Sequence, residues 1–237
     1  MNLSSKSLFH FTPKFEYLTD ILRNGFWPRY CREYGWGNKY IDFAVPMVCF
    51  CDIPLSMIKE HIKSYGDFGI GVSRDWIRKQ KTITPVQYVA LESNEYNSIN
   101  RLLTQLKNNN ITDDGISKLL LVKKVSGKIL DKDKTIKTKI FYNEKEWRYV
   151  PDTLQKDELI LSIKKTEVFN SDVASEKTLN SKLTIDIDSI KYLIVPNEQY
   201  RMKMIKEISH TYSKENKNKK LNLISKILIK SQILNDF

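Results

Sequence analysis

The apolar residues of this chain come in short runs, each broken by glycine, proline or charged residues. Runs of this length form single strands or one face of a helix, and none approaches the 18 consecutive apolar residues of a membrane-spanning helix. The run Leu8–Phe11 is followed by Thr12 and Pro13, which favour the start of a helix, and Gly25 suits its end. The chain therefore opens with a strand followed by a helix.

Similar patterns predict strands and helices along the rest of the chain. We expect strands at 45–51, 68–73, 86–91, 140–142, 146–150, 159–163, 183–187 and 192–195. Helices are predicted at 54–64, 74–77, 96–106, 116–121 and 196–208. The stretch from Phe26 to Tyr40 has no clear period, which indicates an ordered loop. This mixture predicts an α+β fold with a mixed central β-sheet and flanking helices.

Length and hydrophobic content favour one core. The 237 residues are 41% hydrophobic, which is enough for a single α+β domain over residues 1–212, followed by a basic tail over 213–237. Within the tail, Leu221–Leu234 has the spacing of an amphipathic helix, which could dock on the domain, pair with another protein or touch a membrane surface. Met1–Ser7 has no apolar run before a cleavage site, so we expect no signal peptide and a cytoplasmic protein.

The positive charge is concentrated in two segments. The net charge is +11. Residues 118–145 hold nine lysines and three acids, and residues 200–237 hold nine basic residues and three acids, so each segment carries +6 and the remainder −1. Such a concentration suits contact with nucleic acid through phosphate neutralisation. The alternative is a solvated lysine-rich surface, because 31 of the 39 basic residues are lysine.

The three cysteines do not form a disulfide framework, because their number is odd and the chain is long. Cys49 and Cys51 are two residues apart in an apolar run, so on a strand both point to one face. A second pair of ligands at suitable spacing is absent. We therefore predict buried, reduced thiols and no metal site.

Several separated segments resemble the AbiGi family of abortive-infection proteins. They are Leu8–Thr12, Ile21–Gly25, Val45–Asp52, Phe68–Ser73 and Phe141–Pro151, and they occur in the order found in that family. The resemblance extends over roughly residues 5–200. It implies a role in phage resistance, as an antitoxin with a co-encoded toxin as partner.

A looser resemblance is to ADP-ribosyltransferase-like folds, in which an early strand with histidine and threonine is combined with a glutamate on a late strand. It implies NAD as the substrate, with Glu146 stabilising the oxocarbenium-like centre at the ribose and Glu144 positioning the acceptor. His10 would bind the adenosine ribose or a phosphate, with Thr12 assisting at a helix N-terminus, and Tyr65 would stack on nicotinamide.

Each candidate also has a structural interpretation. His10 lies between two phenylalanines and could be a hydrogen-bonded interior residue, while Glu146 could pair with a cation and Glu144 could be solvated. His61 is interpreted as a surface residue, because lysines flank it. Two hypotheses stay open: an NAD-dependent transferase in phage defence, and a non-catalytic antitoxin that neutralises a toxin or represses its operon.

The pair Gly69 and Gly71 has a structural interpretation as well. The third glycine and the long following helix of a dinucleotide-binding motif are absent, so the two glycines are expected to shape a strand.

Overall fold

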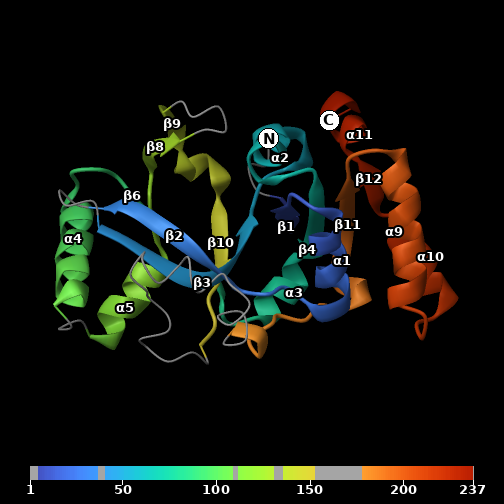
Figure 1. Cartoon of the computed structure of the whole chain (residues 1–237), viewed down its shortest axis with the longest axis horizontal. Helices are drawn as coiled ribbons and strands as arrows, with labels where there is room; N and C mark the ends of the chain where they lie inside the picture. Colours follow the sequence, from blue (N-terminus) through green and yellow to red (C-terminus); the bar gives the residue numbers. More distant parts are fainter. Residues whose placement is uncertain (1–4, 37–40, 109–111, 131–135, 153–177, 237) are drawn as a thin grey trace. The chain divides into compact units, whose positions relative to one another are not determined.

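The computed structural model describes residues 5–36, 41–108, 112–130, 136–152 and 178–236 (Figure 1). The chain divides into two compact units. Unit 1 comprises residues 1–27, 49–81 and 182–237, and unit 2 comprises residues 28–48 and 82–181. The predicted boundary at residue 212 stays a prediction, although this division assigns the C-terminal segment to unit 1.

Unit 1 is built on four strands in the order β12-β11-β4-β1. Strand β1 (Ser7–Thr12) pairs antiparallel with β4 (Phe68–Ser73), which pairs antiparallel with β11 (Ile190–Val195). The last strand, β12 (Ile227–Ile229), is parallel to β11. The sheet is therefore mixed, as predicted, and the strands expected at 68–73 and 192–195 are confirmed.

Helices flank this sheet. On one face, α2 (Lys59–Tyr65), the short helix η1 (Leu55–Met57) and α11 (Lys230–Asp236) pack on Phe9 and Phe11 of β1. On the other, Phe15 of α1 (Phe15–Asn24) contacts Phe68, and both rings contact Tyr200 of α9 (Glu198–Thr211). Helix α3 (Arg74–Lys79) follows β4 directly, capped by Ser73. The predicted α+β class with flanking helices is confirmed.

The opening strand and helix form as predicted, with a small shift. Helix α1 begins at Phe15, two residues after Pro13. It ends at Gly25, whose φ of 84° lies in the left-handed region, where its N–H donates to the carbonyl oxygen of Ile21.

Gly69 and Gly71 make room for two aromatic rings of the neighbouring strand. A Cβ atom at Gly71 would lie 2.8 Å from Cε1 of Phe9 and 3.0 Å from Cδ2 of Tyr192. At Gly69 it would lie 2.7 Å from Cε1 of Phe11. These glycines shape the strand by admitting large rings across it, in agreement with the structural interpretation of the sequence.

We expect Gly71→Ala to lower the free energy of unfolding by about 1–3 kcal/mol, because the methyl group overpacks the space that Phe9 occupies. Urea denaturation measures the change. Combining it with Phe9→Leu should cost less than the sum of the two single changes, since leucine vacates the ring position. An unchanged midpoint for Gly71→Ala would contradict the packing argument.

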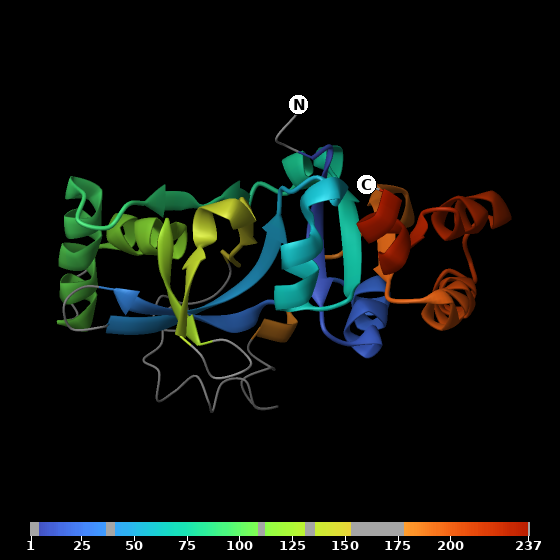
Figure 2. The same cartoon turned by 90° about the horizontal axis from the view of Figure 1, so that it is seen from above.

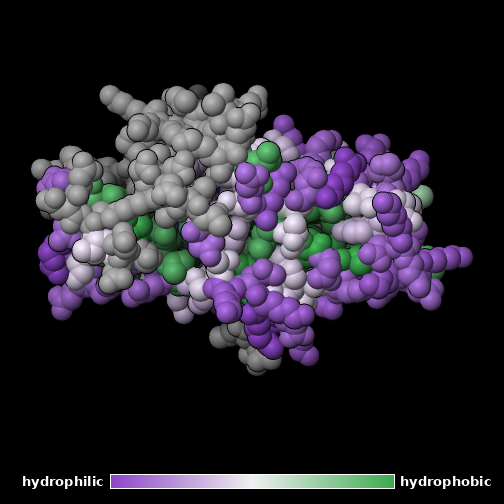
Figure 3. Space-filling model, turned by 90° about the horizontal axis from the view of Figure 1, so that it is seen from below, coloured by the Kyte–Doolittle hydropathy of each residue, from purple (hydrophilic) through white to green (hydrophobic). Residues whose placement is uncertain are grey.

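The C-terminal segment does not form the predicted continuous helix over Leu221–Leu234. Helix α10 (Lys217–Ile224) ends first, β12 follows, and α11 completes the chain. The apolar residues 227–229 pair with Leu193–Val195 of β11 instead of continuing the helix. Their burial in a parallel sheet outweighs helical periodicity. The surface formed by α9 and α10 is largely hydrophilic (Figure 3).

Unit 2 contains the strands β2, β3, β10 and β5 as neighbours in one sheet. Strand β2 (Arg29–Trp36) pairs antiparallel with β3 (Ile41–Cys51), whose last three residues belong to unit 1. Strand β10 (Glu146–Tyr149) pairs antiparallel with β5 (Ile83–Pro85). The prediction of a loop over Phe26–Tyr40 is wrong, because its larger part pairs as β2. Pairing with a long, apolar neighbour makes a strand of a segment without its own period.

Two small ribbons and two helices complete unit 2. Strand β6 (Gln87–Val89) pairs in parallel with β7 (Val122–Lys124), and β8 (Ser126–Leu130) pairs antiparallel with β9 (Ile136–Ile140). Helix α4 (Asn94–Lys107) packs against α5 (Asp113–Leu120) (Figures 1 and 2). The buried residues of these elements include Ile99, Leu103, Ile116, Leu119 and Val122.

Two other strand predictions have different outcomes. The strand expected at 183–187 is wrong: Leu183 forms one bridge with Phe26, and Ile187 begins the short helix η3 (Ile187–Ser189). The strand expected at 159–163 lies outside the described residues. Across the described ranges, no helix has the length and apolar character needed to cross a bilayer.

Candidate functional site

Glu144 and Glu146 are brought together, although not on one strand. Glu144 ends the short helix η2 (Phe141–Glu144), and Glu146 begins β10. Between them, Lys145 has a φ of 42°, in the left-handed region. This turn separates the two glutamates, yet both carboxylates reach the same lysine, Lys123. The expectation of strand pieces at 140–142 is therefore corrected, since residues 141–144 are helical.

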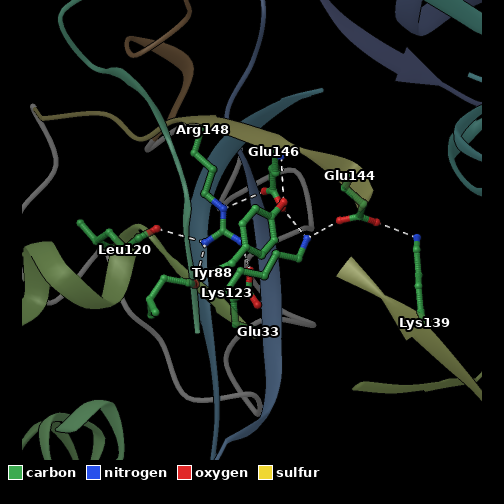
Figure 4. A network of polar contacts seen from close by, with 9 residues as sticks. Glu33, Tyr88, Leu120, Lys123, Lys139, Glu144, Glu146 and Arg148 are labelled. Atoms are coloured by element: carbon green, nitrogen blue, oxygen red, sulfur yellow. Dashed lines mark hydrogen bonds and ion pairs between the residues drawn. The ribbon is translucent and has the colours of Figure 1, made fainter. Parts of the chain in front are cut away.

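Arg148 is the centre of the polar contacts around Glu146 (Figure 4). The two residues are two apart on β10, so their side chains share one face. Nε of Arg148 donates to Oε1 of Glu146 at 2.7 Å, and Nη1 donates to the carbonyl oxygen of Leu120 at 3.1 Å. Nη2 pairs with the carboxylate of Glu33 on β2. Only 1% of Arg148 is exposed, so its charge depends on these partners.

Lys123 of β7 joins the two glutamates. Its Nζ donates to Oε2 of Glu144 at 2.7 Å and also to Oε2 of Glu146. Lys139 of β9 pairs with the other oxygen of Glu144, Oε1, at 2.7 Å. We call this set the ion network; it comprises Glu33, Lys123, Lys139, Glu144, Glu146 and Arg148. Three carboxylates and three cations give it a formal charge of zero.

The electrostatics of the ion network keep Glu146 and Lys123 charged. Burial raises the pKa of Glu146, but Arg148 and Lys123 outweigh this effect and hold the pKa at about 2. Burial lowers the pKa of Lys123, whereas Glu146 and Glu144 raise it, and the result is a pKa well above the usual range for lysine. The Glu146 carboxylate and the Lys123 ammonium are therefore both charged at neutral pH.

Tyr88 of β6 also contacts Glu146. Its hydroxyl oxygen accepts a hydrogen bond from the backbone N–H of Glu146 at 2.9 Å. Burial is the main cause of a raised pKa for this phenol, which therefore remains protonated. Its ring packs edge-on against Tyr142, with centroids 5.2 Å apart.

Both oxygens of the Glu146 carboxylate accept hydrogen bonds from side chains of the protein. One oxygen accepts from Arg148 and the other from Lys123, and only 5% of the residue is exposed. A carboxylate that stabilises a sugar cation must touch the sugar. In the described conformation Glu146 instead serves as a counter-ion for two buried cations.

The other predicted site residues lie in unit 1. His10 is on β1, where its Nδ1 lies 2.8 Å from the carbonyl oxygen of Cys49. Because a carbonyl oxygen only accepts, Nδ1 carries the proton. Burial lowers the pKa of the ring, which lies edge-on to Phe26 and Phe50. His10 is thus a hydrogen-bonded interior side chain; its role toward NAD stays a prediction.

Thr12 and Tyr65 have contrasting environments. Thr12 is buried at the end of β1, and its Oγ1 has no hydrogen-bond partner among the described residues. Tyr65 ends α2 with 41% of its surface exposed, and its ring packs at a tilt against that of His61, with the centroids 5.0 Å apart. His10, Thr12 and Tyr65 therefore belong to one unit and the two glutamates to the other, so the single predicted pocket stays a prediction.

Cys51 is buried, and both Cys31 and Cys49 are partly exposed. The prediction of burial is therefore correct for Cys51 alone, and that of reduced thiols stays a prediction. In the parts of the chain that the structure describes, no group of three or more histidine, cysteine or acidic side chains is placed to hold a metal ion.

Sequence reasoning missed most members of the ion network. Arg148 had a local signal, since it alternates with Glu146 on a strand. Lys123 and Lys139 were considered only as part of a charged segment, and Glu33 lay in the predicted loop. Lys123 lies 21 positions from Glu144, and Glu33 lies 115 positions from Arg148, so no local pattern indicates these contacts.

The chain is similar to a known protein family and to a known protein. The model of a family described as "Putative abortive phage resistance protein AbiGi, antitoxin" matches residues 24–196. The chain belongs to the AbiGi family. An abortive phage resistance protein AbiGi of Lactococcus lactis subsp. cremoris is 27% identical over 230 residues, covering 83% of this chain and 90% of that protein. No solved structure matches the chain. The AbiGi match spans Glu33, Lys123, Lys139, Glu144, Glu146 and Arg148, that is, the whole ion network.

Proposed function

We propose that this AbiGi-family protein acts in abortive infection as a non-catalytic antitoxin that binds and neutralises a co-encoded toxin. The observation that carries the proposal is the state of Glu146: its carboxylate is buried and both of its oxygens bind internal cations. A residue held in this way stabilises the fold of unit 2. The description of the family as an antitoxin supports the same function.

A second candidate is the NAD-dependent transferase. It is favoured by Thr12, whose buried Oγ1 lacks a partner in the described residues just before α1. The N-cap of α1, Lys14, supplies no side-chain hydrogen bond, so the N-terminus of this helix could accept an anionic group such as a phosphate. In this function His10 and Tyr65 would contact the nucleotide, and Glu146 would have to exchange an internal cation for the ribose.

A titration with NAD, followed by thermal unfolding, separates the two candidates. A true NAD site would stabilise the protein by about 2.7 kcal/mol at a 100-fold excess of NAD over its dissociation constant. We expect NAD to leave the Tm unchanged. We also expect the protein to bind the purified product of the adjacent gene. A dose-dependent rise in Tm that Thr12→Val abolishes would favour the transferase. The control is Thr104→Val, a threonine on the exposed surface of α4.

Contact with nucleic acid is a further part of this proposal, since an antitoxin can also repress its own operon. The helices α9 and α10 and the turn between them present five exposed lysines, namely Lys203, Lys206, Lys214, Lys217 and Lys219. Their surface is hydrophilic in Figure 3. Cations gathered in this way suit a phosphate backbone through counter-ion release.

A further inference from the structure

The β8–β9 hairpin has an open edge. Its strands pair from Ser126 with Ile140 to Leu130 with Ile136. In the part of the chain that the structure describes, β9 pairs with no other strand, so one side of its backbone has no strand neighbour. An edge of this kind is a template on which another chain can add a strand, and proteins usually protect it.

One face of β9 carries exposed apolar side chains, whereas its two lysines, Lys137 and Lys139, lie on the other face. Ile136 is 71% exposed and Ile140 is 52% exposed, and strand alternation places both on one face with Thr138. Tyr142, just beyond the strand, is 55% exposed. Apolar side chains that gather on an open edge are typical of a surface that a partner covers.

The hairpin is held firmly at its base. Lys139, on the face of β9 opposite to Ile136 and Ile140, pairs with the buried Glu144. The N–H of Tyr142 donates to the carbonyl oxygen of Val125 at 3.1 Å. Gly127 lies against the ring of Phe141, where a Cβ atom would come within 2.9 Å. The ion network therefore fixes the edge before any partner binds, which lowers the entropic cost of binding.

The charge around the hairpin indicates what binds to it. Residues 118–145 carry nine lysines against three acids, a net charge of +6. Lys123, Lys139 and Glu144 belong to the neutral ion network, so the rest of this segment carries seven lysines against two acids, a net charge of +5. An acidic partner is therefore attracted. Isoleucine side chains neither stack on bases nor bind phosphates, so a protein segment fits this edge better than a nucleic acid.

We propose that the edge of β9 binds an extended, acidic segment of the toxin, which adds to the hairpin as a third strand and covers Ile136 and Ile140. This inference rests on the antitoxin function proposed above. It assigns the partner-binding surface to the hairpin and gives the ion network a role, namely to hold that surface in place.

The test is a calorimetric titration of the purified product of the adjacent gene into the full chain. We expect the double variant Ile136→Ser and Ile140→Ser to bind about 10- to 100-fold more weakly, because the apolar anchors are lost. The matched control is Leu91→Ser, which removes a leucine of similar exposure elsewhere in unit 2. It should bind as the wild type does. On complex formation, amide hydrogen exchange should slow at alternate residues of β9.

The outcomes separate the two proposals. Equal binding by the wild type and the double variant would overturn the hairpin as the docking surface and leave the antitoxin function intact. If the wild type failed to bind, the antitoxin function would fail, and this inference with it. If the wild type bound a single-stranded RNA probe, and the double variant lost that binding but kept the toxin, the hairpin would be a nucleic-acid surface and our proposal would be overturned.

Discussion

Replacing Arg148 by methionine should lower the free energy of unfolding by about 3–5 kcal/mol, the typical cost of removing one partner of a buried ion pair. The guanidinium binds Glu146, Glu33 and the carbonyl oxygen of Leu120, and it is almost fully buried. Methionine fills a similar volume without the charge, so the two carboxylates would lose a shared cation inside unit 2. Urea denaturation at neutral pH measures the loss.

The same substitution at an exposed arginine of unit 2 provides the control. Arg101 on α4 donates to Ser98 and lies at the surface, so Arg101→Met should change the stability by less than about 0.5 kcal/mol. Adding Glu33→Gln and Glu146→Gln to Arg148→Met should recover part of the loss, because the orphaned charges are then removed. Equal stability of Arg148→Met and the wild type would contradict the central position of Arg148.

The strands and helices with strong local signals could be predicted from the sequence. The run Phe68–Ser73 is apolar and bounded by turn residues, and it forms β4 with the predicted limits. Helix α1 ends before Gly25, whose φ is positive. Glycine adopts a positive φ readily, so the sequence alone indicates this helix end. The failures have a common cause. Residues 29–36 and 227–229 become strands by pairing with β3 and β11, and the periodicity within one segment does not report such pairing.

The candidate site could likewise be predicted only in part from the sequence. Glu144 and Glu146 were singled out because of their spacing and a family resemblance, and the structure does bring them together. Their surroundings could not be foreseen, because the cations come from β7, β9 and β10. Two carboxylates at this spacing suit either chemistry on a ligand or a buried ion network. Only the positions of Lys123 and Arg148 distinguish these alternatives.

The stability of the protein should also fall steeply in acid, and Glu146 should account for much of the slope. Its pKa is about 2 in the folded chain, against 4.5 for a glutamate exposed to water. A folded-state pKa below the unfolded one stabilises the protein above the unfolded pKa, and this contribution is lost as the pH falls toward the folded pKa. A difference of about 2.5 pKa units corresponds to roughly 3 kcal/mol. The loss should therefore occur between about pH 5 and pH 2.

Urea midpoints measured across this range test the assignment. Glu146→Gln should be less stable than the wild type at neutral pH, because Arg148 and Lys123 then share one carboxylate fewer, and its stability should depend less on pH. Glu92→Gln, which removes an exposed carboxyl group of unit 2, should retain the wild-type slope. If Glu146→Gln kept both the stability and the slope of the wild type, its carboxylate would be free for work on a ligand, and the transferase would regain support over the antitoxin.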